Sequence, residues 1–335
     1  MQFSSPRLEA QAGVAVHNSD HMRTLDLRQV EVFYYVAKFR SFSKAAEALL
    51  LTQPTISGHI KTLEESLALV LFDRLGREIT LTQAGEVLYS YAKRLLSVKT
   101  AAVQALQELQ GGVSGELLIG GSSIPGQYVL PPILGHFKRQ YPDITVCLSI
   151  TDTMDTIERI IRGDLELGVV GAWVQHAQVL YDRFVEDELV LAVGHDHPWA
   201  QQGTVPLMAL ATEPFIQRER GSGSRLVMEQ TLKQHGFEPT LLRTVAEMGS
   251  TEAIKQGIKA GIGVSILSRI ALIDELKAGS VEIVTIEGVT LQRHFYIIRH
   301  RGRTLSPLCQ TFERFLHRID PVSLLPRDMS HNGQP

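Results

Sequence analysis

Residues 52–61, TQPTISGHIK, carry side chains that hydrogen-bond to nucleic acids at most positions. A glutamine amide such as that of Gln53 can make two hydrogen bonds to an adenine edge in the major groove of DNA. Hydroxyl, imidazole and ammonium groups bind phosphate oxygens and so fix a protein on the duplex. DNA recognition is therefore one candidate chemistry of this segment, through Thr52, Gln53, Pro54, Thr55, Ser57, Gly58, His59 and Lys61.

The apolar residues predict a helix over residues 53–67 that holds this polar face outward. Its buried stripe consists of Ile56, Ile60, Leu63 and Leu67. A shorter helix precedes it, with Ser43 as the expected N-cap. Two short helices joined by a tight turn occur in ordinary packing and in DNA-binding helix-turn-helix motifs, so the pattern alone leaves both open.

The segment VLFDRLGREITLT, residues 70–82, is typical of two short strands around a Gly-Arg turn. Arg74 and Arg77 lie on this predicted hairpin, from which they could reach the DNA backbone or minor groove as a wing. The region is not basic overall, because seven Lys and Arg residues between Leu25 and Ser90 are matched by eight Asp and Glu. The whole chain has a formal net charge of −3. DNA would therefore have to contact a local patch.

A second group of polar side chains stands where predicted strands end and helices begin. Two serines start the helix in GGSSIPGQYVLPPIL, and GSGSR and GSTEAIK repeat the arrangement. Helix N-terminal amides and hydroxyls together bind anions, although capping is the simpler role for one of the first two serines. The residues expected around a small anion are Ser122, Ser123, Thr153, Arg220, Ser222, Ser224, Ser250 and Thr251, with Arg218 and Arg225 as further candidates.

These helix starts belong to a segment, residues 115–320, in which strand-like and helical runs alternate. Such alternation predicts βαβ units and a mainly parallel sheet. The runs form two sets, which predicts two α/β lobes joined by crossing strands. A cleft between such lobes commonly holds a small ligand.

Residues 82–110 predict one long helix with a heptad seam. A seam of this kind packs against a partner helix, and packing against its own domain is the alternative. We expect dimerisation, because the helix is long and its opposite face is polar. GGVSG at 111–115 ends the helix as a hinge or linker. The seam residues are Leu88, Tyr91, Leu95, Val98, Ala102, Ala105 and Leu109.

Several classes of chemistry find no support. Cys147 and Cys309 are isolated, so neither a disulfide framework nor a zinc site is expected, and Cys147 should be buried in a strand. HDHP at 195–198 lacks a third ligand, so we expect no metal. No P-loop or nucleophile elbow occurs, so we expect neither an enzyme nor a cofactor. No segment is typical of a membrane span or signal peptide, which favours a cytoplasmic protein.

Residues 33–88, FYYVAKFRSFSKAAEALLLTQPTISGHIKTLEESLALVLFDRLGREITLTQAGEVL, resemble the N-terminal domain of LysR-type transcriptional regulators. The resemblance extends from about residue 25 to 320. Three positions depart from the family pattern: Ala68 replaces a usual glycine, Val70 a frequent polar residue, and Gly58 a long side chain. The matching residues are Ser41, Ser43, Ala45, Ala46, Leu49, Gln53, Pro54, Ser57, Ile60, Leu63, Glu64, Leu71, Phe72, Asp73, Arg74, Leu81, Thr82, Ala84 and Gly85.

The resemblance implies a winged helix-turn-helix, mainly α, a dimerising linker helix, and an effector domain like a periplasmic binding protein, with two α/β lobes. It adds Ser41 and Ser43 to the DNA contacts. It also implies a dimer of dimers on interrupted palindromes in double-stranded promoter DNA, with RNA polymerase as a further partner. The expected boundaries are a disordered extension 1–24, a DNA-binding domain 25–83, a linker 84–113, an effector domain 114–320 and a flexible tail 321–335. Lobe I should cover about 114–189 and 290–320, and lobe II about 190–289.

The serine-rich segments GGSSIPGQYVLPP and RERGSGSR look most like those of regulators of cysteine biosynthesis and sulfur metabolism. That narrower resemblance favours a sulfate-like or sulfite-like oxyanion, or a small carboxylate, as the effector. The alternative hypothesis is a solute-binding α/β protein whose N-terminal helices only mediate association. An association helix would bury the polar face of residues 53–61, whereas a DNA-binding helix would expose it.

Overall fold

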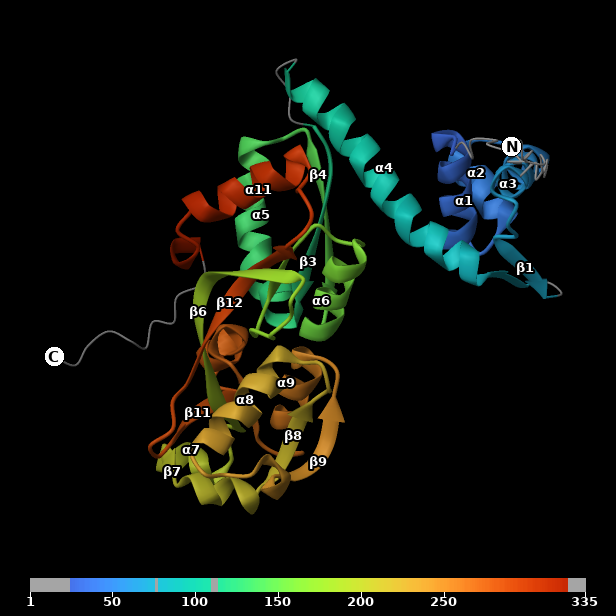
Figure 1. Cartoon of the computed structure of the whole chain (residues 1–335). Helices are drawn as coiled ribbons and strands as arrows, with labels where there is room; N and C mark the ends of the chain where they lie inside the picture. Colours follow the sequence, from blue (N-terminus) through green and yellow to red (C-terminus); the bar gives the residue numbers. More distant parts are fainter. Residues whose placement is uncertain (1–24, 76–77, 110–113, 325–335) are drawn as a thin grey trace, which may run out of the picture. The chain divides into compact units, whose positions relative to one another are not determined.

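The computed structural model describes residues 25–75, 78–109 and 114–324, and the chain divides into two units between Leu96 and Ser97 (Figure 1). The predicted extension 1–24 lies outside the described residues. So does most of the predicted tail, whose first residues form a 3₁₀ turn, η5 (Val322–Leu324).

The first unit consists of helices around one core and a small antiparallel hairpin. Val30, Phe33, Ile56 and Leu63 are fully buried in that core. The strand pairing sets Phe72 opposite Leu81, which forms the predicted hairpin. The predicted helix-turn-helix is confirmed. The elements are α1 (Leu27–Phe39), α2 (Phe42–Leu49), α3 (Gln53–Leu67), β1 (Phe72–Leu75), β2 (Glu78–Leu81) and the start of α4 (Gln83–Leu109).

The cap of α2 corrects one prediction. Ser41, not Ser43, is the N-cap, and its side chain accepts a hydrogen bond from the backbone N–H of Lys44 at 3.2 Å. An N-cap residue stands immediately before the first helical residue, and α2 begins at Phe42. Ser43 is therefore inside the helix, where its hydroxyl is available for another contact.

Helix α3 ends at Ala68, whose φ of 53° and ψ of 38° lie in the left-handed region. A Cβ there costs roughly 1–2 kcal/mol, which explains why glycine suits the position. The turn keeps its hydrogen bonds, because the N–H groups of Ala68 and Leu69 donate to Glu65 and Glu64 carbonyls. The Glu64 carboxylate also accepts from the Leu71 N–H at 2.7 Å and so ties the helix to the hairpin.

Helix α4 begins in the first unit and ends in the second. Leu88 is buried in the core of the first unit, so this predicted seam residue packs against its own domain. Farther along, Tyr91 is 54% exposed, Leu95 37% and Val98 67%, and Ala102 is also exposed. An exposed apolar stripe at heptad spacing is the surface that a partner helix would cover.

The second unit is built on a mixed sheet, which corrects the expectation of a mainly parallel one. Strands β4 (Ile144–Thr151), β3 (Gly115–Ser122) and β5 (Leu167–Val170) are parallel neighbours. In contrast, β12 (Leu291–His300) pairs antiparallel with both β5 and β6 (Val179–Gly194). The reason is geometric: β6 (Val179–Gly194) and β12 (Leu291–His300) both run through the two lobes. One strand leaves lobe I and the other returns to it, so the two must be antiparallel (Figure 1).

Each lobe packs helices against strands, and in lobe II β8 (Pro214–Arg218) and β9 (Arg243–Met248) form a separate two-stranded parallel sheet. Lobe I contains β3 (Gly115–Ser122), α5 (Leu130–Gln140), β4 (Ile144–Thr151), α6 (Thr153–Arg162), β5 (Leu167–Val170) and α11 (Pro307–Arg318). Lobe II contains α7 (Pro198–Gln202), β7 (Thr204–Val205), β8 (Pro214–Arg218), α8 (Gly223–Gln234), β9 (Arg243–Met248), α9 (Thr251–Lys259), β10 (Ser265–Ser268), α10 (Ile273–Lys277) and β11 (Val281–Ile286). Short 3₁₀ turns are η2 (Leu207–Ala211), η3 (Pro239–Leu241) and η4 (Arg269–Leu272).

Two details of lobe I differ from the predictions. The helix expected near 125–139 already begins at Ser123 and contains a π-helical turn, η1 (Pro125–Val129), before α5 continues it. Cys147 is exposed, whereas Cys309 is the buried cysteine. Strand β4 lies at the edge of the sheet, and Cys147 is on its uncovered face, which an apolar run by itself does not reveal. Burial raises the pKa of the Cys309 thiol well above its usual range.

Candidate functional sites

Helix α3 exposes the polar face that its sequence predicts. Ile56, Ile60 and Leu63 are at most 3% exposed and face the core of the first unit. On the other side, the described positions with exposed side chains or backbone are Thr52, Gln53, Pro54, Thr55, Gly58 and Lys61, and Ser57 and His59 are half-buried. Such a surface can donate to and accept from the edges of bases and the oxygens of phosphates.

The start of α3 is held in place by hydroxyl groups. The Ser43 hydroxyl donates to Oε1 of Gln53 at 3.3 Å, which leaves the amide nitrogen and the second lone pair of Oε1 for other partners. Thr52 caps α3 as predicted, and its hydroxyl accepts from the Thr55 N–H at 3.4 Å. Ser43 thus orients the residue expected to contact bases. Ser41 has no such role, because it caps α2.

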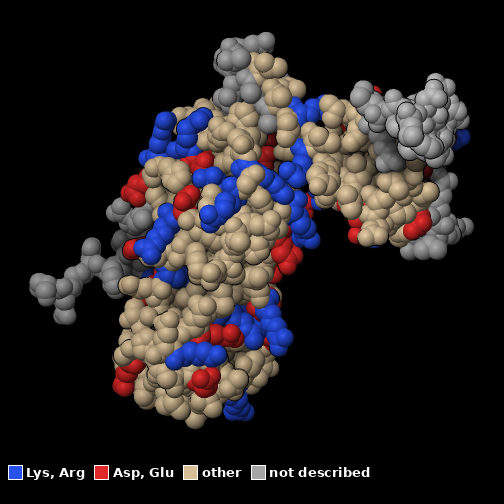
Figure 2. All heavy atoms as spheres, viewed as in Figure 1, with Lys and Arg blue, Asp and Glu red and all other residues tan. Residues whose placement is uncertain are grey.

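The described charges of the first unit do not by themselves define a basic patch. Figure 2 shows a visible face of this unit that is largely free of Lys and Arg. Lys61 pairs weakly with Glu65 at 3.7 Å, and both side chains are well exposed. The backbone of Arg74 pairs with Ile79 in the hairpin, but the side chain of Arg74 and the whole of Arg77 lie outside the described residues.

A second site is a small cavity between the lobes of the second unit. Its volume is about 10 Å³, room for about one water molecule. It meets the ends of helices from both lobes and one crossing strand. Its lining residues are Ser122, Ser123, Ile124, Pro125, Thr153, Arg218, Ser222, Gly223, Ser224 and Arg293.

Arg293, on the crossing strand β12, is one of two buried cations that line this cavity. Its Nε donates to Asp187 at 2.7 Å, and its Nη1 donates to Ser224 at 3.0 Å. Its Nη2 is buried and has no hydrogen-bond partner among the described residues. Burial lowers the pKa of Arg293, the Asp187 carboxylate opposes this, and the charge of Arg218 lowers the pKa further. Arg293 stays protonated because arginine does not titrate in proteins.

Arg218, at the end of β8, bridges the two lobes. Its Nη1 donates to Thr251 of lobe II at 3.1 Å, and its Nη2 donates to Ser123 of lobe I at 3.1 Å. Glu219 accepts from Nε at 2.7 Å and from Nη2 at 2.6 Å, so it neutralises this guanidinium. Two buried guanidinium groups therefore face one cavity, each paired with a carboxylate.

One of the predicted hydroxyl residues lines the cavity with no described hydrogen-bond partner, others line it with one, and another caps a helix outside it. Thr153 lines the cavity with a buried hydroxyl that lacks a partner among the described residues. Ser122, whose hydroxyl accepts from the Gly171 N–H at 2.9 Å, and Ser222, which caps α8, also line it. Ser250 caps α9 and does not line the cavity. Helical backbone already begins at Ser123, and no side-chain hydrogen bond caps the π-helical turn that follows.

One correction concerns the arginines. Arg220 is exposed and does not line the cavity, because it follows the strand end in a surface turn. Arg218, two residues earlier, lines the cavity in the position predicted for Arg220. Arg225 pairs with Glu229 and Glu247, each at 2.8 Å.

Sequence reasoning missed Arg293 and its partner Asp187. A signal was present in LQRHFYIIRH: alternate residues from Leu291 to Ile297, including Arg293, are the buried ones in that part of the strand. A charge at a core position of such a pattern requires a buried partner.

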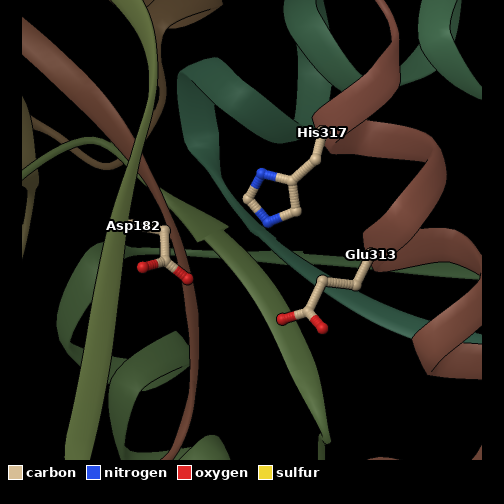
Figure 3. Close-up of side chains that lie close together, drawn as sticks. All are labelled: Asp182, Glu313 and His317. Atoms are coloured by element: carbon tan, nitrogen blue, oxygen red, sulfur yellow. The ribbon is translucent and has the colours of Figure 1, made fainter.

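Two other features of the second unit are weaker candidates for a binding site. A hollow of about 440 Å³ lined by Trp173, Tyr181 and Arg301 is larger, but its arginine is exposed. Asp182, Glu313 and His317 place possible ligand atoms within 4.8 Å of one another (Figure 3).

We assign no metal site to these three residues. Nε of Arg299 lies 3.0 Å from Oε1 of Glu313, so a cation already neutralises that carboxylate. A metal would have to compete with this guanidinium for Glu313. In the HDHP segment, His197 caps α7 and lies 3.5 Å from Glu213. Among the described residues, no helix combines the length and hydropathy that a membrane span requires.

Two family models match the chain. The model described as "LysR substrate binding domain" matches residues 110–319, and "Bacterial regulatory helix-turn-helix protein, lysR family" matches residues 27–86. The HTH-type transcriptional activator CmpR of Synechocystis sp. is 34% identical over 299 residues, 89% of this chain and 97% of the relative. The RuBisCO operon transcriptional regulator of Acidithiobacillus ferrooxidans is 34% identical, covering 88% and 94%. Neither is named as a sulfur regulator, so that narrower resemblance stays a prediction.

Solved structures agree with the fold. The Synechocystis CcmR regulatory domain in complex with 2-PG is 32% identical, with a TM-score of 0.56, over 61% of this chain and 96% of that one. Full-length CbnR complexed with its target DNA is 23% identical, with a TM-score of 0.63, over 88% and 99%. At that identity the likeness to CbnR concerns the fold alone.

Proposed function

Because this chain belongs to the LysR family of bacterial transcriptional regulators, we propose that its DNA binding is set by a small anion held between the lobes of its effector domain. The observation that carries the proposal is the pair of buried guanidinium groups around one cavity. Arg293 Nη2 and the Thr153 hydroxyl are buried there without partners among the described residues. Buried polar atoms of this kind require a hydrogen-bonding partner, and a ligand oxygen can supply one.

The ligand class follows from the donors. Guanidinium, hydroxyl and helix N-terminal N–H groups all donate to oxygen anions, so a phosphate, sulfate or carboxylate group fits them. The CcmR domain, which is similar to this effector domain, was solved with 2-PG, and that supports a small anion here. The mechanism is a population shift, in which the anion favours one arrangement of the lobes. In a dimer of dimers this would change the spacing of the DNA-binding units.

The anion proposal is tested on the full chain. Unfolding temperature is measured with inorganic phosphate, sulfate, sulfite, acetate and 2-PG, each against chloride at equal ionic strength. At least one anion should raise it in a saturable manner, because a ligand that binds only the folded state stabilises it by mass action. The same anion should alter the DNase footprint on a duplex that the protein selects from a random pool. If none of these anions gives a saturable shift in unfolding temperature, the proposal of an anionic effector is wrong.

A separate prediction concerns base recognition. Gln53→Ala should reduce the preference for the selected duplex over random DNA by about 1–3 kcal/mol, because bidentate base contacts have this magnitude. Lys61→Ala is the matched control. It should weaken binding to both duplexes by the same factor and reduce the salt dependence of the affinity. Fluorescence anisotropy titrations over a range of salt concentrations measure both. Equal losses on both duplexes for Gln53→Ala would show that Gln53 contacts only the backbone.

The solute-binding alternative predicts no selected duplex at all. The exposure of the polar face of α3 argues against that alternative, because an association helix would bury these residues. RNA polymerase as a partner follows from the family resemblance alone.

A further inference from the structure

A second contact between the lobes lies beside the anion cavity. The hydroxyl of Tyr128, on η1 of lobe I, donates to Oε1 of Glu252, on α9 of lobe II, at 2.5 Å. Nζ of Lys255 lies 2.7 Å from the Glu252 carboxylate and 5.6 Å from the centre of the Tyr128 ring. Lys255 is itself buried and fixed by the Glu275 carboxylate at 3.1 Å. The contact therefore joins one lobe to a rigid ion pair of the other.

This contact shares its backbone with the walls of the cavity. Tyr128 belongs to the same π-helical turn as Pro125, which lines the cavity. Glu252 directly follows Thr251, which accepts the hydrogen bond of Arg218. Single π-helical turns occur frequently at functional sites, where they displace a side chain from the regular helical position. Any separation of the two walls must stretch or break the Tyr128–Glu252 bond.

The size of the cavity sets the direction of the effect. At about 10 Å³ it accommodates roughly one water molecule, and a phosphate or carboxylate ligand is larger. The walls must therefore separate before such an anion enters. Resting on the proposed function, we propose that Tyr128, Glu252 and Lys255 form an inter-lobe clamp that holds the narrow cavity and opposes effector binding.

The protonation states suit a permanent clamp. Burial, together with the hydrogen bond to Glu252, raises the pKa of Tyr128 to about 12, so the donor proton remains at neutral pH. Burial alone would raise the pKa of Glu252, but the hydrogen bonds from Lys255 and Tyr128 outweigh it and lower that pKa. The bond therefore joins a neutral donor to a charged acceptor, which is stronger than a bond between neutral groups.

The test removes the hydroxyl alone. Tyr128→Phe should bind phosphate, or whichever anion of the panel binds the wild type, about three- to tenfold more tightly by isothermal titration, the scale of one typical intramolecular hydrogen bond, because this bond is exposed. Tyr141→Phe, which removes a hydroxyl from the same lobe next to Gln140, is the control and should leave the affinity unchanged. Glu252→Gln should resemble Tyr128→Phe, and the double variant should add little to either.

A second readout needs no ligand. Hydrogen exchange of the amides in residues 123–130 and 251–258 should accelerate in Tyr128→Phe and not in Tyr141→Phe. Faster exchange without anion binding to the wild type would support the clamp and overturn the proposed anion. Unchanged exchange, or an affinity that is unchanged or weaker in Tyr128→Phe, overturns the clamp, whatever the effector.

Discussion

Asp187→Asn should destabilise the second unit by about 3–5 kcal/mol, because it leaves the guanidinium of Arg293 buried without a counter-charge. Both side chains of this ion pair are at most 3% exposed, and Nε of Arg293 lies 2.7 Å from Asp187. The Ser268 hydroxyl also donates to Asp187 at 2.7 Å, so the carboxylate is fixed from two directions. An asparagine keeps the size of the side chain but cannot neutralise the cation.

Urea unfolding followed by tryptophan fluorescence measures this loss. The chain has two tryptophans, Trp173 and Trp199, and both lie in the second unit, so the signal reports that unit alone. Glu188→Gln is the matched control at the neighbouring residue. Glu188 pairs with Arg269 at 3.0 Å with both side chains partly exposed, and its replacement should cost less than about 1 kcal/mol. Similar losses for the two variants would show that Arg293 finds another partner.

The same ion pair explains why the proposed anion site could be only partly predicted. The serines and threonines were found because helix starts leave a local pattern, in which a strand is followed by hydroxyl residues. Arg293 and Asp187 stand 106 residues apart and meet only because β6 and β12 pair. Arg220 was chosen over Arg218 because the sequence does not mark where β8 ends. Arg218 is the last strand residue and faces the cavity, whereas Arg220 reaches solvent.

The fold was more predictable where the signal is local. The helix-turn-helix, the hairpin and the long helix follow from apolar spacing, which sets the buried stripe of each helix directly. The strand directions in the effector unit do not follow from alternation, because a strand that crosses between lobes looks like any other apolar run. Cys147 shows the same limit, since its burial depends on whether other elements cover that face of β4.

Val98→Asp is expected to dissociate the proposed dimer and to weaken binding to the selected duplex by about 10²-fold or more. Two linked DNA-binding units gain roughly this factor or more over one, because the second contact is intramolecular. Val98 is 67% exposed on α4 and continues the stripe of Tyr91 and Leu95. A buried charge at this seam would lose its hydration without gaining a partner. Sedimentation measures the association, and anisotropy measures the DNA affinity.

The control keeps the position apolar. Val98→Leu should retain both association and DNA binding, because a heptad seam tolerates aliphatic exchange better than a charge. The tryptophan signal of Val98→Asp should match the wild type, since the side chain is already exposed in the single chain. If Val98→Asp associates as strongly as the wild type, another surface joins the protomers. Dissociation with DNA affinity retained would mean that one winged unit suffices for recognition, and the heptad seam would then serve assembly alone.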